Sequence, residues 1–327
     1  MYKTFYNLRL NPFEITPDPA FLFATPGHNE ALASLYYGVR AHKGFVVVTG
    51  EVGTGKTLLV RCVLELFKRS DVAFAYVFNP SLSPLEFIRY IAGDFGIPVA
   101  GRAKDEVILA LSSFLVERHQ RKLTTLLVVD EAHHLSTEVL EEVRLLTNLE
   151  TAQQKLLQII LAGQPELDEK LDSFGLRQLK QRVALRCHLH PLSLDDCRGY
   201  MQRRLQIAGT PRPGSIFSES AVASVHRYSK GIPRLVNTIC ENALLLGYAK
   251  RAATISHECI EEVTHDLRLH IVPVPEKAAD GNSSGKEQDK DELLRAVKML
   301  LELHDYLQEM RVSESKGPDP VTHGARA

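Results

Sequence analysis

Residues 50–57 read Gly50-Glu51-Val52-Gly53-Thr54-Gly55-Lys56-Thr57, and they follow an apolar run at residues 45–49. Leu58 opens the stretch 58–64 on the other side, so the loop lies between a predicted strand and a predicted helix. Glycines in such a loop let successive backbone N–H groups turn toward the β- and γ-phosphates of a nucleotide. Lys56 would add a positive charge, and the Thr57 hydroxyl would bind Mg²⁺. Residues 50–58 are therefore predicted to bind ATP and Mg²⁺; a glycine-rich turn with an incidental lysine is the weaker alternative.

A second buried-type strand, at residues 125–129, ends in the carboxylates Asp130 and Glu131. Asp130 is predicted to complete the Mg²⁺ site. Glu131 is placed to polarise a water for attack on the γ-phosphorus, which favours hydrolysis over phosphorylation of a small molecule. The alternative for Glu131 is a solvated acid at the start of the next helix, where the helix dipole favours negative charge.

The composition excludes little. A chain of 327 residues with 44% hydrophobic residues can hold two domains and a tail. The net charge of −1 gives no overall attraction to DNA or to an anionic membrane. The five cysteines are scattered, which predicts free thiols in a reducing compartment. No signal peptide or membrane-length apolar stretch is visible, so we expect a soluble, cytoplasmic protein.

Strands and helices alternate through residues 1–190, the predicted nucleotide-binding domain. Further strands are expected at residues 72–79, 123–130, 156–162 and 185–189, and helices at residues 84–95, 104–120 and 137–149. Strands separated by helices predict an α/β fold with a parallel five-stranded sheet between two helical layers. Ligands bind such sheets at the carboxyl ends of the strands, where the loop and both carboxylates fall.

Only helices are predicted after residue 190. They lie at residues 195–208, 218–229, 233–250 and 256–269, with Ser193, Ser218 and Ser256 at N-cap positions. These helices predict a small helical domain over residues 191–270. Residues 271–289 are typical of a flexible linker, and residues 313–327 of a disordered tail. The segment 290–312 between them predicts an amphipathic helix that docks on its own protein or binds a partner.

Four further stretches carry a family resemblance. They are Phe5-Tyr6-x-Leu8-x-x-Asn11-Pro12-Phe13-x-x-Thr16-Pro17-Asp18-Pro19, His28-x-x-Ala31-Leu32, Gly163-Gln164-Pro165-Glu166-Leu167 and Gly231-x-Pro233-Arg234. Together with the phosphate loop and the Asp-Glu strand, which correspond to the Walker A and Walker B motifs, residues 1–269 resemble an AAA+ ATPase. Within that class they resemble the family of ExeA, or general secretion pathway protein A. The resemblance implies a P-loop NTPase fold followed by a helical lid domain.

The same resemblance implies roles for three more residues. Gln164 resembles the sensor that hydrogen-bonds the γ-phosphate or the attacking water, although a turn amide is the alternative. Arg234 resembles the second sensor, which couples lid motion to the phosphate charge. Arg182 resembles the arginine finger given to a neighbouring subunit, with Arg177 and Arg186 as competing candidates, and a finger acting in trans implies a homo-oligomer. A solvated arginine is the alternative for each of these arginines.

Three positions near the site are less defined. Asn79 ends the second strand, where related proteins hold a polar residue that withdraws Glu131 until a partner binds; a turn-forming asparagine is an equal alternative. His133 and His134 depart from the family, which commonly has a polar residue such as glutamine there; they tune the site or are satisfied side chains at a helix start.

Longer family members continue into a membrane span and a peptidoglycan-binding domain, and without these we do not expect direct wall binding.

Three functions fit these features. The first is a Mg²⁺-dependent ATPase whose assembly powers or regulates a cell-envelope process, such as secretion or exopolysaccharide export, with a protein partner; the envelope link comes only from the resemblance. The second is a DNA-associated regulator of the transposition-targeting or origin-recognition type, for which residues 118–122 and 177–186 supply basic surface. The third is a slow nucleotide switch that acts through the C-terminal helix.

Overall fold

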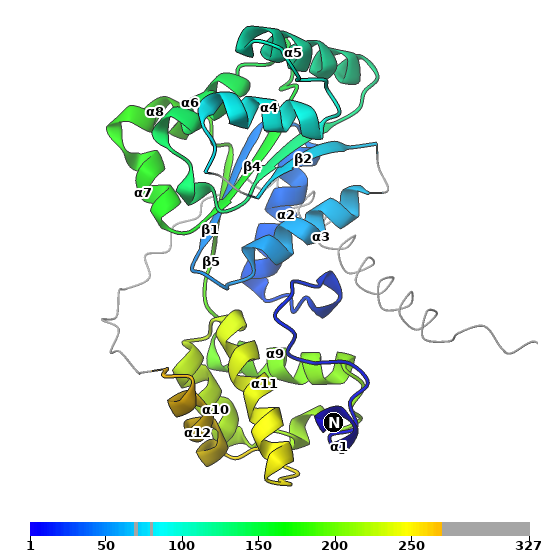
Figure 1. Cartoon of the computed structure of the whole chain (residues 1–327), viewed down its shortest axis with the longest axis vertical. Coiled ribbons are helices and arrows are strands. Elements are labelled where there is room, and N and C mark those ends of the chain that lie inside the picture. Colours follow the sequence, from blue (N-terminus) through cyan, green and yellow to red (C-terminus); the bar gives the residue numbers. More distant parts are fainter. Residues whose placement is uncertain (69–70, 79–80, 270–327) are drawn as a thin grey trace, which may run out of the picture. The chain divides into compact units, whose positions relative to one another are not determined.

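Five parallel strands form one sheet in the order β2-β3-β4-β1-β5 (Figure 1). The central strand β1 pairs with β4 and β5, since Val47 lies opposite Leu161 on one side and Arg186 on the other. The predicted parallel five-stranded α/β sheet is confirmed. The strands are β1 (Phe45–Gly50), β2 (Ala73–Val77), β3 (Thr125–Val129), β4 (Gln158–Gly163) and β5 (Leu185–Leu189).

The computed structural model describes residues 1–68, 71–78 and 81–269. Asn79, the predicted linker, the predicted C-terminal helix and the predicted tail lie outside these residues. Within the described part, no helix combines the length and apolar character needed to cross a bilayer.

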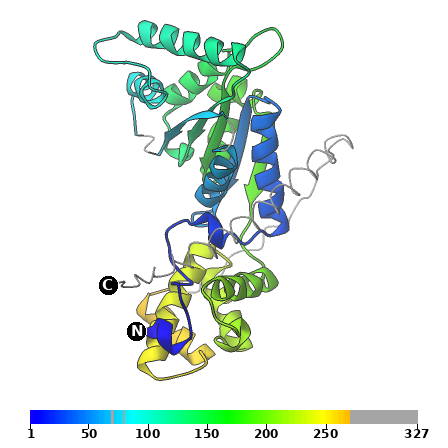
Figure 2. The same ribbon diagram turned by 90° about the vertical axis from the view of Figure 1, so that its right-hand side faces the viewer.

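Helices cover both faces of the sheet because successive side chains of each strand point to opposite sides. Phe45 and Val47 of β1 belong to a core with α4 (Pro84–Asp94), α5 (Lys104–Gln120), α6 (Thr137–Leu146), α7 (Glu166–Asp172) and α8 (Arg177–Lys180). The other face packs on α2 (Pro26–Arg40) and α3 (Lys56–Phe67). There Gly38 lies so close to β1 that an added Cβ would come within 2.4 Å of Val46 Cγ2. Figure 2 shows the sheet between the blue α2 and the cyan to teal α4 and α5, which completes the three layers.

A second hydrophobic core lies among the C-terminal helices. It is built from α9 (Leu194–Ile207), α10 (Glu219–Ser229), α11 (Pro233–Ala249) and α12 (His257–Asp266). Ser193 and Ser218 cap their helices, accepting hydrogen bonds from the backbone N–H groups of Asp196 and Ala221. Ser256 occupies the N-cap position of α12 but makes no side-chain capping bond.

The N-terminal segment packs into this helical core. The segment includes α1 (Tyr2–Phe5) and the 3₁₀ turn η1 (Pro19–Phe21), and it contributes the buried side chains Tyr2, Tyr6, Leu8 and Phe13. The buried Arg204 of α9 holds it in place. Its guanidinium donates from Nη2 to the Glu14 carbonyl oxygen at 3.1 Å and stacks on the Phe21 ring at 4.7 Å. Residues that the sequence grouped with the nucleotide-binding domain therefore contribute to the helical core.

Candidate nucleotide site

The phosphate loop joins β1 to α3, as predicted from its flanking residues. Gly53 and Gly55 have φ values of +82° and +106°, which residues with a Cβ rarely adopt. Lys56 begins α3, and its Nζ donates to the carbonyl oxygens of Gly50 and Glu51 at 2.7 and 2.9 Å. Only 5% of Lys56 is exposed, and this burial lowers the pKa of its ammonium, opposed by the nearby Glu131 and Asp130. The loop therefore holds a buried cation for which phosphate oxygens would be natural partners.

Asp130 lies at the centre of the polar cluster after β3. Its Oδ2 accepts hydrogen bonds from the Thr57 hydroxyl at 2.8 Å and the Tyr76 hydroxyl at 2.9 Å, and its Oδ1 accepts from the backbone N–H of Glu131 at 2.9 Å. Burial and the adjacent Asp130 raise the pKa of Tyr76, so this phenol remains a donor. Carboxylate and hydroxyl oxygens are the ligands that Mg²⁺ prefers. Thr57 and Asp130 therefore offer oxygen ligands of the kind that a magnesium ion binds.

Tyr76 was not identified from the sequence as a site residue. It lies on β2 opposite Val128 of β3, which brings its side chain beside the end of β3. The alternating pattern of β2 could have placed it on one face of the sheet, but the pairing of β2 with β3 could not be read from the chain.

Glu131 has a left-handed backbone, with φ 51° and ψ 36°, and it precedes the 3₁₀ turn η2 (Ala132–His134). This conformation is uncommon for a residue with a side chain and is found at functional sites. The Glu131 side chain is 45% exposed, and its Oε2 lies 3.5 Å from Nδ1 of His133. The carboxylate can therefore reach solvent directly beside the phosphate loop and the Asp130 cluster.

Gln164 follows β4, the neighbour of β3 in the sheet. Its Nε2 lies 2.8 Å from Nε2 of His133. His133 is buried, and its pKa is lowered by burial and by the neighbouring His134, so the ring is neutral. The structure thus brings together Glu131, His133 and Gln164, which the sequence considered separately.

His28 contacts the phosphate loop through its side chain. Its Nδ1 lies 2.7 Å from the Thr25 hydroxyl, and its Nε2 lies 3.2 Å from the Thr54 carbonyl oxygen. Burial lowers the pKa of His28, and a neutral ring that accepts from Thr25 can donate to Thr54. The sequence included His28 only as part of a family pattern; its contact with the loop joins residues 26 positions apart.

Arg234 starts the lid helix α11 beside the phosphate loop. Its backbone N–H donates to the Gly53 carbonyl oxygen at 3.2 Å, and an added Cβ on Gly53 would lie 2.7 Å from Arg234 Cβ. The Arg234 side chain is exposed. The family resemblance assigns the Arg234 guanidinium to the charge of the phosphates, and the backbone of Arg234 lies directly against the phosphate loop.

The three candidate arginine fingers have different surroundings. Arg186 donates to Asp168 Oδ1 at 2.6 Å, and the other oxygen of Asp168 accepts from the Thr49 hydroxyl. Arg182 donates to Asn148 Oδ1 at 2.8 Å. Arg177 is exposed and lies 4.5 Å from the centre of the Phe174 ring. Arg186 is therefore the candidate most firmly engaged within its own chain.

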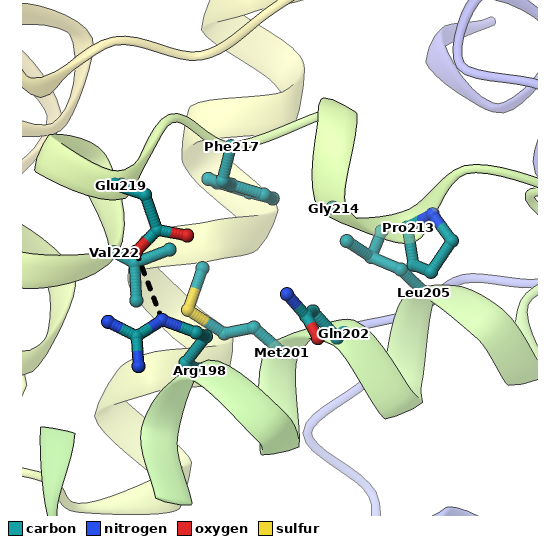
Figure 3. Close-up of a pocket in the computed structure, with 9 residues that line it drawn as sticks. All are labelled: Arg198, Met201, Gln202, Leu205, Pro213, Gly214, Phe217, Glu219 and Val222. Carbon is teal, nitrogen blue, oxygen red and sulfur yellow. Dashed lines mark hydrogen bonds and ion pairs between the residues drawn. The ribbon is translucent and has the colours of Figure 1, made fainter. Parts of the chain in front are cut away.

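A shallow hollow lies apart from this cluster, between α9, α10 and the 3₁₀ turn η4 (Pro213–Ser215) (Figure 3). Apolar side chains including Met201 and Phe217 line it, and an Arg198–Glu219 ion pair of 3.0 Å lies at its edge. Both charges of that pair are already neutralised by each other, so the hollow gives no reason to expect a charged ligand.

Residues 39–171 match the AAA domain family. They form an AAA domain. The chain is also 42% identical over 268 residues to general secretion pathway protein A of Aeromonas hydrophila. The aligned residues make up 82% of this chain and 48% of that protein. The predicted resemblance to this family is confirmed, and the chain spans about half the length of the curated relative that it matches.

Solved structures confirm the fold of the AAA domain and the helices that follow it. The ORC2 protein of Aeropyrum pernix, solved in ADPNP-ADP complexes, is 16% identical with a TM-score of 0.58, over 79% of this chain and 73% of that chain. Cdc6p from Pyrobaculum aerophilum is 19% identical with a TM-score of 0.57, over 76% and 70%. The RuvB Holliday junction branch migration motor of Thermotoga maritima is 15% identical with a TM-score of 0.51, over 74% and 70%. At these identities the likeness concerns the fold alone, and the roles of the site residues stay predictions.

Proposed function

We propose that this protein hydrolyses ATP with Mg²⁺ at the site formed by the phosphate loop and the end of β3. The observation that carries the proposal is the 2.8 Å hydrogen bond between Thr57 and Asp130, directly beside the exposed carboxylate of Glu131. This contact joins the two motifs that were 73 residues apart in the sequence. It supports a single site with phosphate-binding, metal-binding and base functions.

In the proposed reaction, the backbone N–H groups of residues 53–57 bind the phosphates, and Lys56 balances their negative charge. Glu131 accepts a proton from a water whose oxygen forms a bond to the γ-phosphorus. The bond between the γ-phosphorus and the bridging oxygen breaks, and the products are ADP and phosphate. Thr57 and Asp130 would hold Mg²⁺, which neutralises charge on the phosphates when it is bound.

We infer that Gln164 orients the attacking water or the γ-phosphate and that Arg234 couples the lid to the phosphates. The contact of Arg234 with Gly53 supports the second role, since it places the start of α11 against the loop. A finger acting in trans would make the active form a homo-oligomer. Arg182 remains our first candidate and Arg177 the second, because the ion pair with Asp168 makes Arg186 less available.

We further propose a role in a cell-envelope process, in which a protein partner is driven or regulated by the ATPase. The name of the Aeromonas relative supports secretion as that process. The five free cysteines fit a reducing compartment such as the cytoplasm.

The DNA-binding alternative has less support. Arg118, from the basic segment 118–122, donates to the carbonyl oxygens of Asp71 and Thr124 at 2.7 and 2.9 Å. Arg186 pairs with Asp168. In these contacts Arg118 and Arg186 are paired with oxygens of the protein itself, which leaves them less available to phosphates of DNA.

ATP turnover measured against protein concentration, with and without duplex DNA, tests the proposal. We expect turnover to rise more than linearly with concentration and to be independent of DNA. Glu131→Gln should lower turnover on the order of 10² to 10⁴-fold while ATP still binds, because only the general base is lost. Glu138→Gln, an exposed acid on α6, is the matched control and should behave as wild type. Wild-type turnover in Glu131→Gln would sink the proposed mechanism, and turnover only with DNA would favour the regulator.

A further inference from the structure

We propose that His133 is a positioning residue that holds the Glu131 carboxylate and links it to Gln164. The inference rests on the proposed ATPase function and extends it. It concerns the segment Ala132-His133-His134, which directly follows Glu131.

The order of the strands brings the three residues together. Glu131 and His133 follow β3, and Gln164 follows β4, which pairs with β3 in parallel. Parallel neighbours end at the same edge of a sheet, so residues 31 positions apart become neighbours. His133 lies between the other two, with one ring nitrogen toward each.

The hydrogen-bond pattern decides which ring nitrogen carries the proton. Nε2 of Gln164 can only donate, so Nε2 of His133, 2.8 Å away, accepts. In a neutral ring the proton is then on Nδ1, which faces Oε2 of Glu131 at 3.5 Å. The backbone N–H of Gln164 also points at Nδ1, at 3.4 Å, and this long hydrogen bond is lost in the tautomer that carries the proton there. The opposite tautomer would point a lone pair at a carboxylate, so the charge of Glu131 favours the first arrangement.

The surroundings fix the position of the ring. His133 is 8% exposed, and its carbonyl oxygen accepts a hydrogen bond from Lys170 Nζ, which also donates to Leu135. Gly163 lies against the backbone of His133, because an added Cβ there would come within 3.3 Å of the His133 backbone nitrogen. The exposed His134 ring packs against the His133 ring, with 3.9 Å between the ring centres and an angle of 41° between their planes. A ring held in this way can hold a mobile partner in place.

Glu131 is such a partner. Nearly half of its side chain is exposed, so without a donor beside it the carboxylate would sample several rotamers. Glu131, His133 and His134 also offer atoms within 4.8 Å of one another, as a cation would require. The bond between His133 and Gln164 favours positioning, because it already uses Nε2 and leaves only Nδ1 for Glu131.

The test separates turnover from binding in His133→Leu, which has no polar atom, and His133→Gln, whose amide can both donate and accept. Turnover of ATP and the Kd of a fluorescent ATP analogue are measured for each. We expect His133→Leu to lower kcat about 10 to 100-fold, the cost of a misplaced catalytic group, with Kd changed less than about threefold. His133→Gln should recover most of the lost turnover. His265→Gln, at a histidine of α12 whose side chain is 90% exposed, is the matched control and should match wild type.

A double-mutant cycle tests the link to Gln164. If both residues act on Glu131 through one contact, His133→Leu combined with Gln164→Leu should lose no more turnover than the worse single variant. Losses that multiply would overturn the link. If circular dichroism shows that His133→Leu is unfolded, His133→Asn replaces it in the cycle, because its shorter side chain does not reach Gln164.

The outcomes keep the two proposals apart. Full activity in His133→Leu, beside an inactive Glu131→Gln, would overturn the role of His133 and leave the ATPase mechanism intact. Full activity in Glu131→Gln would overturn the mechanism itself. A weaker Kd in His133→Leu with unchanged kcat would show that the histidine supports nucleotide binding instead, and would also overturn the inference.

Discussion

Gly53 is the residue at which the phosphate loop meets the lid helix. Its φ of +82° and the 2.7 Å approach of Arg234 Cβ leave no room for a methyl group. We predict that Gly53→Ala pushes Arg234 away from the loop and weakens ATP binding about tenfold or more, equivalent to about 1.4 kcal/mol. The measurement is the Kd for ATP, followed by a thermal unfolding curve.

Gly101 provides the control for this substitution. It has a similar φ of +72°, but an added Cβ would meet no atom within 4 Å. Gly101→Ala therefore carries the backbone strain of about 1 to 3 kcal/mol without the collision. Equal Kd values for the two variants would show that strain, rather than contact with Arg234, explains the effect.

Most residues of the candidate site could be proposed from the sequence, but their contacts could not. Lys56, Thr57, Asp130 and Glu131 could be placed because each follows a strand or opens a helix in a local pattern. The contacts of Asp130 with Tyr76, and of His133 with Gln164, depend on which strands are neighbours. Strand order is a property of the packed sheet, and one sequence does not contain it in a local pattern.

Helices α4 and α5 differ in whether the side chain of the N-cap residue forms a capping hydrogen bond. Ser83 forms a capping box at the start of α4, accepting from the Glu86 N–H while Glu86 accepts from the Ser83 N–H. At the start of α5 the N-cap is Ala103, whose side chain cannot accept a bond, although Glu106 still accepts from its N–H. We predict that Ser83→Ala lowers the free energy of unfolding by about 1 kcal/mol and that Ala103→Ser raises it by a similar amount.

Urea unfolding of both variants beside wild type checks this prediction. The two substitutions exchange the same pair of residues in opposite directions, so each serves as the control for the other. A loss of stability in both would mean that packing of the side chain, and not the capping bond, determines the result.

Elements with a clear local signal were predicted closely. The predicted bounds 104–120 and 185–189 are those of α5 and β5. For α5 the signal is clear because Val107, Leu111 and Leu115 mark the buried face of the helix at intervals of four. No helix was predicted before β1, where α2 lies. Its first residues, Pro26 and Gly27, are typical of a turn, yet proline is favoured at the first position of a helix and Thr25 caps it. The short α7 and α8 were missed because their lengths of 7 and 4 residues give too few repeats for a pattern.

Stability of the whole molecule should depend on pH through its histidines. Burial lowers the pKa of His28, His42, His133 and His188 from the usual 6.5. Between the folded and unfolded pKa values the unfolded chain binds more protons, so the free energy of unfolding rises with pH in that range. We therefore predict that stability is complete above about pH 7 and falls as the pH drops through 6.5.

Urea unfolding at pH 7.5, 6.5 and 5.5 tests this prediction. The window lies above the usual range of carboxylates, so their titration does not account for a loss that begins at pH 6.5. His28→Asn should flatten the dependence, whereas His265→Asn, with a side chain that is 90% exposed, should leave it unchanged. Constant stability down to pH 5.5 would contradict the prediction.

The contact between Arg204 and Pro12 joins residues 192 positions apart. On the ribosome the segment around Pro12 emerges before helix α9, which follows only after about 10 to 40 s at ordinary synthesis rates. Until then Tyr2, Tyr6 and Phe13 have no core to enter. The nascent chain therefore exposes an apolar segment while the nucleotide-binding sheet is being made, and a chaperone at the tunnel exit would find a binding sequence there.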